Sequence, residues 1–135
     1  MGKHLVFVYG SLRSGSERSM SMRFPASRFI TAAQVRGSLY DLGPYPGLLL
    51  NEANAQITGE VYEVDDELLQ QLDDFEASSN YLRRQVEISL GDQRRICWTY
   101  EPDPEFYSLR TLIKSGDWLA YAKTKTDWTG EGSGS

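Results

Sequence analysis

Residues 6–15 read VFVYGSLRSG, an apolar strand that runs directly into a small, polar loop. A continuous apolar run of this kind predicts a strand buried on both faces, here from Leu5 to Tyr9. Gly10 and the small residues after it bring backbone N–H groups close together, an arrangement that can bind a carboxylate or phosphate. The loop lacks the Gly-Lys-Ser/Thr of a Walker phosphate loop. Its spacing also fits a simple tight turn, so both interpretations stay open.

The strongest hairpin signal is QVEISLGDQRRICWTY at residues 85–100. Apolar residues alternate on both sides of Gly91-Asp92, a dipeptide typical of type I′ or II′ turns. Residues 57–64 alternate in the same way, and residues 34–50 predict a strand, a turn at GPYPG (residues 43–47) and a second strand. Pro102 should end the second hairpin strand, since proline cannot donate to a sheet.

The remaining segments complete the predicted architecture. Residues 16–30 predict a single helical turn, and the apolar, aromatic residues 112–122 predict a short closing helix or strand pair. Short strands at hairpin spacing with one clear helix predict a small α+β domain, whose mostly antiparallel sheet can curl into a barrel. We expect residues 1–124 to form this domain and residues 125–135, which are rich in Gly and Ser, to be a disordered tail.

The clear helix is DDELLQQLDDFE at residues 65–76. Asp65 suits the N-cap, and the acidic residues after it suit the positive end of the helix dipole. At about 100° per residue, the apolar face comprises Leu68, Leu69, Leu72 and Phe75. Glu76 falls on this face, between Leu69 and Leu72, whereas the other acids of the helix point elsewhere.

Glu76 is therefore the candidate catalytic residue. Burial and the negative end of the helix dipole both disfavour its anion, so they should raise its pKa toward the range of a general base near neutral pH. The alternative is that the helix ends before Phe75 and Glu76 points into water, because predicted helix ends are often misplaced by a residue or two.

Composition narrows the classes of function. The chain has 135 residues, 40% hydrophobic and 24% charged, which fits one soluble domain. Its formal net charge of −5 argues against nucleic-acid and anionic-membrane partners, which need clustered Lys and Arg. No apolar run approaches the ~18 residues of a membrane span, and the chain does not open with a signal-peptide pattern.

The sequence has few residues that bind metals or undergo redox chemistry. One cysteine, Cys97, suits a cytoplasmic location and is expected to be a buried apolar residue. With His4 as the one histidine, no metal site or Cys–His pair has credible spacing. Arg83 and Arg84 fit either anion binding or a solvated strand edge.

The segments together resemble the γ-glutamylcyclotransferase-like (AIG2-like) family, including its γ-glutamylamine cyclotransferase type. The resemblance spans roughly residues 5–120 and rests on VYGSLRSG, GSLYDLGPYPGLL, GEVYEV with LLQQLDDFE, YLRR, WTY and SGDWL. It implies a small mixed, mostly antiparallel β-barrel with flanking helices and a site at one barrel mouth. It also implies that Glu76 is the catalytic carboxylate. The implied substrate loop, which binds a γ-glutamyl group through its backbone, consists of Tyr9, Gly10, Ser11 and Leu12.

The reaction implied by this resemblance converts a γ-glutamyl amide, amine or dipeptide to 5-oxoproline and a free amine. It is an intramolecular aminolysis with a small-molecule substrate and without a metal or organic cofactor. Tyr81 and Tyr100 are candidates for walls or hydroxyl donors of the site. Two alternatives stay open: a module that binds a small carboxylate without turnover, and an enzyme that transfers the γ-glutamyl group to another acceptor. The sequence leaves the leaving amine and the oligomeric state undetermined.

Overall fold

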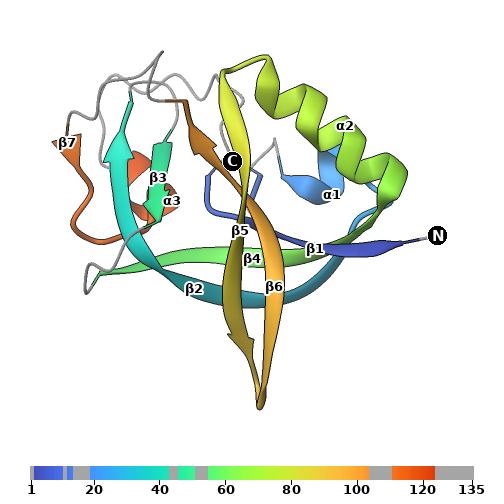
Figure 1. The fold of residues 1–135 in the computed structure, drawn as a ribbon. Coiled ribbons are helices and arrows are strands. Elements are labelled where there is room, and N and C mark those ends of the chain that lie inside the picture. Colours follow the sequence, from blue (N-terminus) through green and yellow to red (C-terminus); the bar gives the residue numbers. More distant parts are fainter. Residues whose placement is uncertain are drawn as a thin grey trace.

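The computed structural model describes residues 2–10, 12–13, 19–42, 46–50, 55–103 and 111–123. A nearly closed, strongly curved barrel is formed by β1 (Lys3–Val8), β2 (Arg28–Asp41), β3 (Pro46–Leu50), β4 (Gln56–Asp65), β5 (Tyr81–Leu90) and β6 (Gln93–Pro102) (Figure 1). A short β7 (Thr111–Leu112) pairs with β2. The helices are α1 (Met20–Arg23), α2 (Asp66–Ala77) and α3 (Trp118–Ala122). The predicted α+β barrel with flanking helices is thus confirmed.

The strand order places β1 inside the sheet. The order is β3-β2-β4-β1-β6-β5, and among the described strands each neighbouring pair is antiparallel except β1 with β6. These two run parallel and meet at Val6 and Trp98. Thr99 Oγ1 donates to the Phe7 carbonyl oxygen at 3.0 Å and strengthens this junction. The sheet is therefore mostly antiparallel, as predicted.

The barrel comes near closure where β3 meets the end of β6. The Leu50 backbone N–H donates to Glu101 Oε2 at 2.7 Å. At Gly47, a Cβ atom would lie 2.9 Å from Pro102 Cγ, so the glycine lets the two strands approach. This seam lies at the same end of the barrel as the loop that follows β1.

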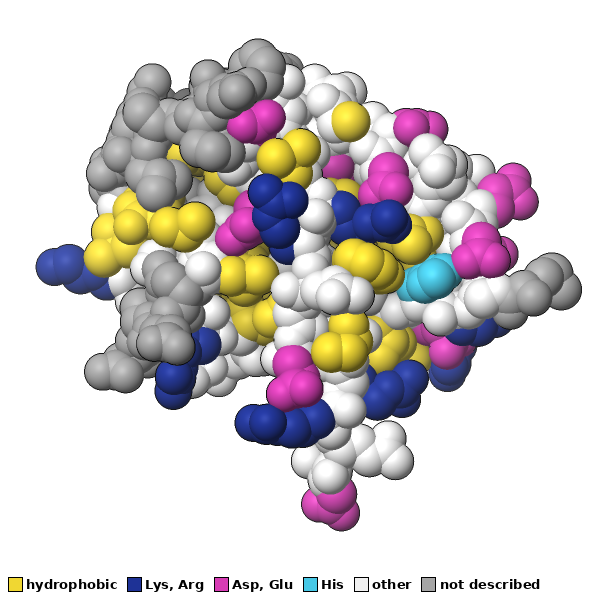
Figure 2. All heavy atoms as spheres, viewed as in Figure 1, with side chains coloured by type: hydrophobic (Ala, Val, Ile, Leu, Met, Phe, Trp, Pro, Cys, Tyr) yellow, Lys and Arg dark blue, Asp and Glu magenta, His cyan; other side chains and the backbone are white. Residues whose placement is uncertain are grey.

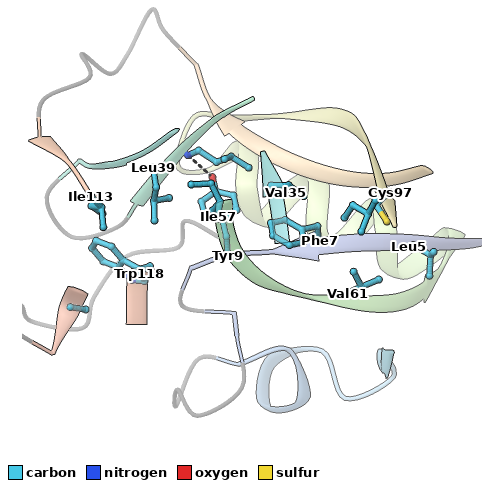
Figure 3. Packing of buried hydrophobic residues seen from close by; sticks show 13 residues of the cluster. Leu5, Phe7, Tyr9, Val35, Leu39, Ile57, Val61, Cys97, Ile113 and Trp118 are labelled. Carbon is cyan, nitrogen blue, oxygen red and sulfur yellow. Dashed lines mark hydrogen bonds between the residues drawn. The ribbon is translucent and has the colours of Figure 1, made fainter. Parts of the chain in front are cut away.

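Two apolar clusters lie on opposite sides of β1, because its side chains alternate. Phe7 and Tyr9 belong to the cluster inside the barrel, which includes Trp118 of α3 (Figure 3). Val6 and Val8 belong to the other cluster, which includes the leucines of α2. The prediction that this strand is buried on both faces is confirmed.

The predicted helix and hairpin are also confirmed. The Asp65 side chain caps α2 by accepting from Leu68 N–H at 2.8 Å. In the β5–β6 hairpin Leu90 pairs with Gln93, and Gly91 has φ +63°, as both predicted turn types require at their first central position. β6 ends at Pro102, and residues 111–122 contain both a short strand and a short helix.

Three strand boundaries were predicted wrongly, and one of them is the start of β5, which lies at Tyr81 rather than Gln85. β2 begins at Arg28 rather than near Gln34, because its first residues form a partly exposed ladder with β4 and lack an apolar alternation. β3 begins at Pro46, inside the predicted turn of residues 43–47, since proline is tolerated as the first residue of a strand.

Some expectations fall outside the described residues. The predicted tail at 125–135 lies there, and so does Ser11 of the predicted substrate loop. The domain boundary at residue 124 stays a prediction. None of the helices in the described part of the chain is long and apolar enough to cross a membrane.

Candidate active site

Glu76 lies inside the protein. Its exposed fraction is 0%, and it shares the buried face of α2 with three leucines, Leu68, Leu69 and Leu72. The helix continues to Ala77, and the Ser79 N–H donates to the Glu76 carbonyl oxygen at 3.0 Å just beyond it. The alternative in which the helix ends before Phe75 and Glu76 points into water is therefore wrong.

Two buried phenols lie near the Glu76 carboxylate. Burial raises the pKa of Tyr9 well above its ordinary value, and the negative charges of Glu76 and Glu101 raise it further. Burial also raises the pKa of Tyr100, as do its bond to Asp73 and the charge of Glu76. Both phenols are therefore protonated at neutral pH and act as hydrogen-bond donors.

The Tyr9 hydroxyl connects the two strands at the barrel seam. It donates to the Tyr100 carbonyl oxygen at 2.6 Å and accepts from the Leu48 N–H at 3.2 Å; Figure 3 draws the bond to Leu48 as a dashed line. Leu48 lies in β3 and Tyr100 in β6, which are not neighbours in the hydrogen-bonded strand order. Tyr9 thus fixes the mouth of the barrel beside Glu76.

Replacing Tyr9 by Phe is expected to lower the free energy of unfolding by about 1–3 kcal/mol, because a buried donor and a buried acceptor each lose their partner. Urea denaturation measures this loss. Tyr121→Phe is the matched control, since its hydroxyl donates to Asp41 Oδ2 at 2.7 Å from a partly buried position. That variant should lose about 1 kcal/mol or less, because Asp41 is partly exposed and water can replace the lost hydrogen bond. Equal losses in the two variants would contradict a special role for the Tyr9 bridge.

Tyr81 and Tyr100 are the other two tyrosines predicted to line the site. The hydroxyl of each donates a hydrogen bond to a group of the protein itself. Tyr81 donates to the Pro46 carbonyl oxygen of β3, which ties β5 to the barrel seam. Tyr100 donates to Asp73 Oδ1 at 2.8 Å. Asp73 also pairs with Arg83 at 3.3 Å, and Arg83 lies 4.3 Å from the Trp98 ring centroid. These bonds hold α2, and with it Glu76, against β5 and β6.

The loop after β1 is a tight turn in its described part. The Arg13 N–H donates to the Gly10 carbonyl oxygen at 3.1 Å. The Leu12 side chain is fully buried in the apolar cluster that includes the leucines of α2. The Leu12 carbonyl oxygen accepts from the Met20 N–H at 2.8 Å. The Leu12 side chain is thus a core residue, so a contact of Leu12 with substrate would have to involve its backbone. Binding of an anion by the N–H groups of this loop stays a prediction.

A partly buried ionic cluster beside this turn was not predicted. Arg13 Nη1 lies 2.7 Å from Asp117 Oδ1, and Arg13 Nε lies 3.8 Å from Glu60 Oε2. Burial opposes ionisation of Asp117, yet hydrogen bonds from Ala120 N–H and Arg13 outweigh it and hold the pKa of Asp117 below its ordinary value. Glu60 lies on the same buried face of β4 as Tyr62 and Val64. A carboxylate among these apolar positions was the one sign in the sequence of a buried ion pair.

The remaining candidates have structural contacts. His4 Nε2 lies 2.5 Å from Asp66 Oδ1, and Arg84 pairs with Glu101 at 3.2 Å. Cys97 is buried, as predicted, and burial raises the pKa of its thiol to about 11. In the described residues, no three His, Cys, Asp or Glu side chains are placed to hold a metal ion. On the face drawn in Figure 2, acidic and basic side chains are interspersed among apolar ones.

Comparison with known proteins places this arrangement in a family. The family described as "Gamma-glutamyl cyclotransferase, AIG2-like" matches residues 6–120. A relative from Vibrio cholerae, named "Putative gamma-glutamylcyclotransferase", is 38% identical over 117 residues, which cover 86% of this chain and 96% of the relative. A second, "Gamma-L-glutamyl-butirosin B gamma-glutamyl cyclotransferase" from Niallia circulans, is 33% identical and covers 86% of this chain and 76% of the relative.

A solved structure agrees with the sequence match. The crystal structure of YkqA from Bacillus subtilis superposes with a TM-score of 0.72 at 30% sequence identity. The match covers 93% of this chain and 44% of YkqA, so this chain spans less than half of that protein. The matched family and these relatives together support an enzyme of the cyclotransferase type. The chain belongs to the γ-glutamylcyclotransferase, AIG2-like family.

Proposed function

We propose that the protein converts a γ-glutamyl amide to 5-oxoproline and a free amine, with Glu76 as general base and then general acid. The observation that carries this proposal is a fully buried carboxylate whose charge acts on the tyrosine at which the loop after β1 begins. The family match supports the reaction type, and the name of the Niallia circulans relative specifies γ-L-glutamyl-butirosin B as the substrate of that relative.

The reaction needs one proton acceptor that later becomes a proton donor. Glu76 takes a proton from the substrate α-ammonium, and the freed amine attacks the γ-carbonyl carbon of the same molecule. A C–N bond forms to close the five-membered lactam, and the amide C–N bond breaks. Glu76 returns this proton to the leaving nitrogen and becomes free to accept the second proton that the cyclising nitrogen loses as it becomes the lactam N–H. That second proton leaves with the released amine, which departs as an ammonium, so protons balance over the cycle.

The enzyme's second task is to hold the substrate in a conformation that can cyclise. Both reacting groups belong to one molecule, so a fixed position of the γ-glutamyl group supplies much of the acceleration. Tyr9, Gly10, Ser11 and Leu12 would hold its α-carboxylate through the backbone, and their N–H groups would stabilise the developing oxyanion. Tyr81 and Tyr100 would line the site.

A substrate panel tests this function directly. The protein is incubated with γ-glutamyl amines, γ-glutamyl dipeptides and γ-glutamyl-butirosin B, and 5-oxoproline is measured by mass spectrometry. We expect lactam and free amine in equal amounts from at least one compound. Saturable binding without product would support a carboxylate-binding module instead. A γ-glutamyl adduct of an added amine, formed without lactam, would support transfer to another acceptor.

A further inference from the structure

Arg13, which directly follows the proposed substrate loop, forms a partly buried ionic cluster with Glu60 and Asp117. The side chains of Arg13 and Glu60 have exposed fractions of 12% and 8%, and that of Asp117 is 29%. The Tyr62 hydroxyl donates to Glu60 Oε1 at 2.9 Å, so this carboxylate has both a neutral donor and a cation beside it. Ions in such a position are costly to bury unless they are paired, and removing one partner leaves the others in an unfavourable environment.

This cluster joins three parts of the chain that are far apart in sequence. Arg13 follows β1, Glu60 belongs to β4, and Asp117 is the N-cap of α3, where it accepts from Ala120 N–H at 3.1 Å. Arg13 and Asp117 are 104 positions apart. Since the Arg13 N–H also closes the turn on the Gly10 carbonyl oxygen, the residue fixes the turn through its backbone and its side chain together.

The turn is thus held at both ends. At its start, the Tyr9 hydroxyl is bonded to β3 and β6. At its end, the Arg13 guanidinium is bonded to α3 and faces β4. The guanidinium already faces two carboxylates, so it is a poor candidate for direct contact with a substrate carboxylate. Its effect on a substrate would pass through the position of the turn.

We propose that Arg13, held by Glu60 and Asp117, is a positioning residue that sets the backbone of the γ-glutamyl-binding turn. This inference rests on the function proposed above. Arginine suits the task because its planar group has several donors at fixed angles and can serve two carboxylates at once. A lysine ammonium retains the charge but is a single point of contact, so the turn would lose one of its supports.

The test measures binding apart from chemistry. In the Glu76→Gln background, which should bind without turnover, the Kd of γ-L-glutamylethylamide is measured by calorimetry with and without Arg13→Lys. We expect Arg13→Lys to weaken binding about 10-fold, and to lower kcat/KM about 10- to 100-fold when Glu76 is present, since small displacements of a bound substrate have effects of this size. The pH dependence of kcat should not move, because Glu76 and its neighbours are unchanged.

Asp117→Asn is the second variant, in case Arg13→Lys does not fold. Asparagine is as good an N-cap as aspartate, so the variant retains the cap of α3 while it removes the charge that faces Arg13. We expect about 3- to 10-fold weaker binding. Arg28→Lys is the matched control. Arg28 is exposed and pairs at 3.1 Å with Glu63, which lies in β4 as Glu60 does. It should leave Kd and kcat unchanged.

The outcomes separate this inference from the proposed function. If Arg13→Lys and Asp117→Asn lower the melting temperature but leave Kd and kcat/KM as in the parent, the cluster is merely structural and the inference is wrong. That result would leave the proposed function intact. Absence of 5-oxoproline release by the unmodified protein over the whole substrate panel would instead overturn the proposed function.

Discussion

Replacing Glu76 by Gln is expected to lower kcat for 5-oxoproline release about 10³-fold, which is within the range for loss of a general acid–base group. The amide has nearly the same shape as the carboxylate but can neither accept the ammonium proton nor return it to the leaving amine. Stopped-time assays with the best substrate of the panel measure the change. Circular dichroism and the melting temperature should stay close to those of the parent protein.

Two further variants make this result specific. Glu76→Asp retains the carboxyl group on a side chain that is shorter by one methylene, which moves it away from the substrate. The kcat of this variant should lie between those of the parent and Glu76→Gln. Glu67→Gln is the matched control, because Glu67 is an exposed glutamate in the first turn of the same helix. Its kcat should stay within about twofold, with a loss of a few tenths of a kcal/mol in stability from the helix dipole. If Glu76→Gln retains more than a tenth of the activity, Glu76 is not the proton carrier.

Replacing Gly59 by Ala is expected to lower the free energy of unfolding by about 3 kcal/mol or more. A Cβ atom at this position would lie 2.3 Å from the Val8 carbonyl oxygen and 2.4 Å from Phe7 Cζ. Both distances are far below contact, and the carbonyl oxygen cannot move unless β1 moves with it. For a domain of this size, the melting temperature should fall by about 10 °C or more.

Gly91→Ala is the control for this prediction. Gly91 has φ +63°, and no atom of the described residues would lie within 4 Å of a Cβ there, so the variant isolates the cost of a left-handed backbone. That cost is about 1–2 kcal/mol. The excess loss at Gly59 then measures the close approach of β1 and β4. A Gly59→Ala protein as stable as Gly91→Ala would contradict the tight packing beneath the substrate loop.

Local sequence rules predicted much of the fold. The Asp65 cap, the β5–β6 hairpin and the burial of β1 each depend on neighbouring residues and on the period of apolar positions, and all three are confirmed. The helical period alone also placed Glu76 on the apolar face of α2. The start of β2 was missed because its partner β4, and not its own pattern, makes it a strand.

The assembly of the site, in contrast, depends on contacts between distant residues. The Tyr9 hydroxyl meets the Tyr100 carbonyl oxygen 91 positions away, and β1 pairs with β6 in the parallel direction. Such contacts are set by how the whole sheet curves, which no short window of sequence records. The same is true of Tyr81, whose hydroxyl is directed to β3 and so ties together parts of the barrel seam.

By itself, the sequence determined the elements that arise from local periodicity and capping, and it singled out one acid on an apolar helix face. The tertiary structure alone decided what surrounds that acid and how the turn after β1 is held. The physical reason is range: dihedral preferences and amphipathic periods act within a few residues. The pairing of Arg13 with Glu60 and Asp117 requires a closed barrel to bring three separate segments together.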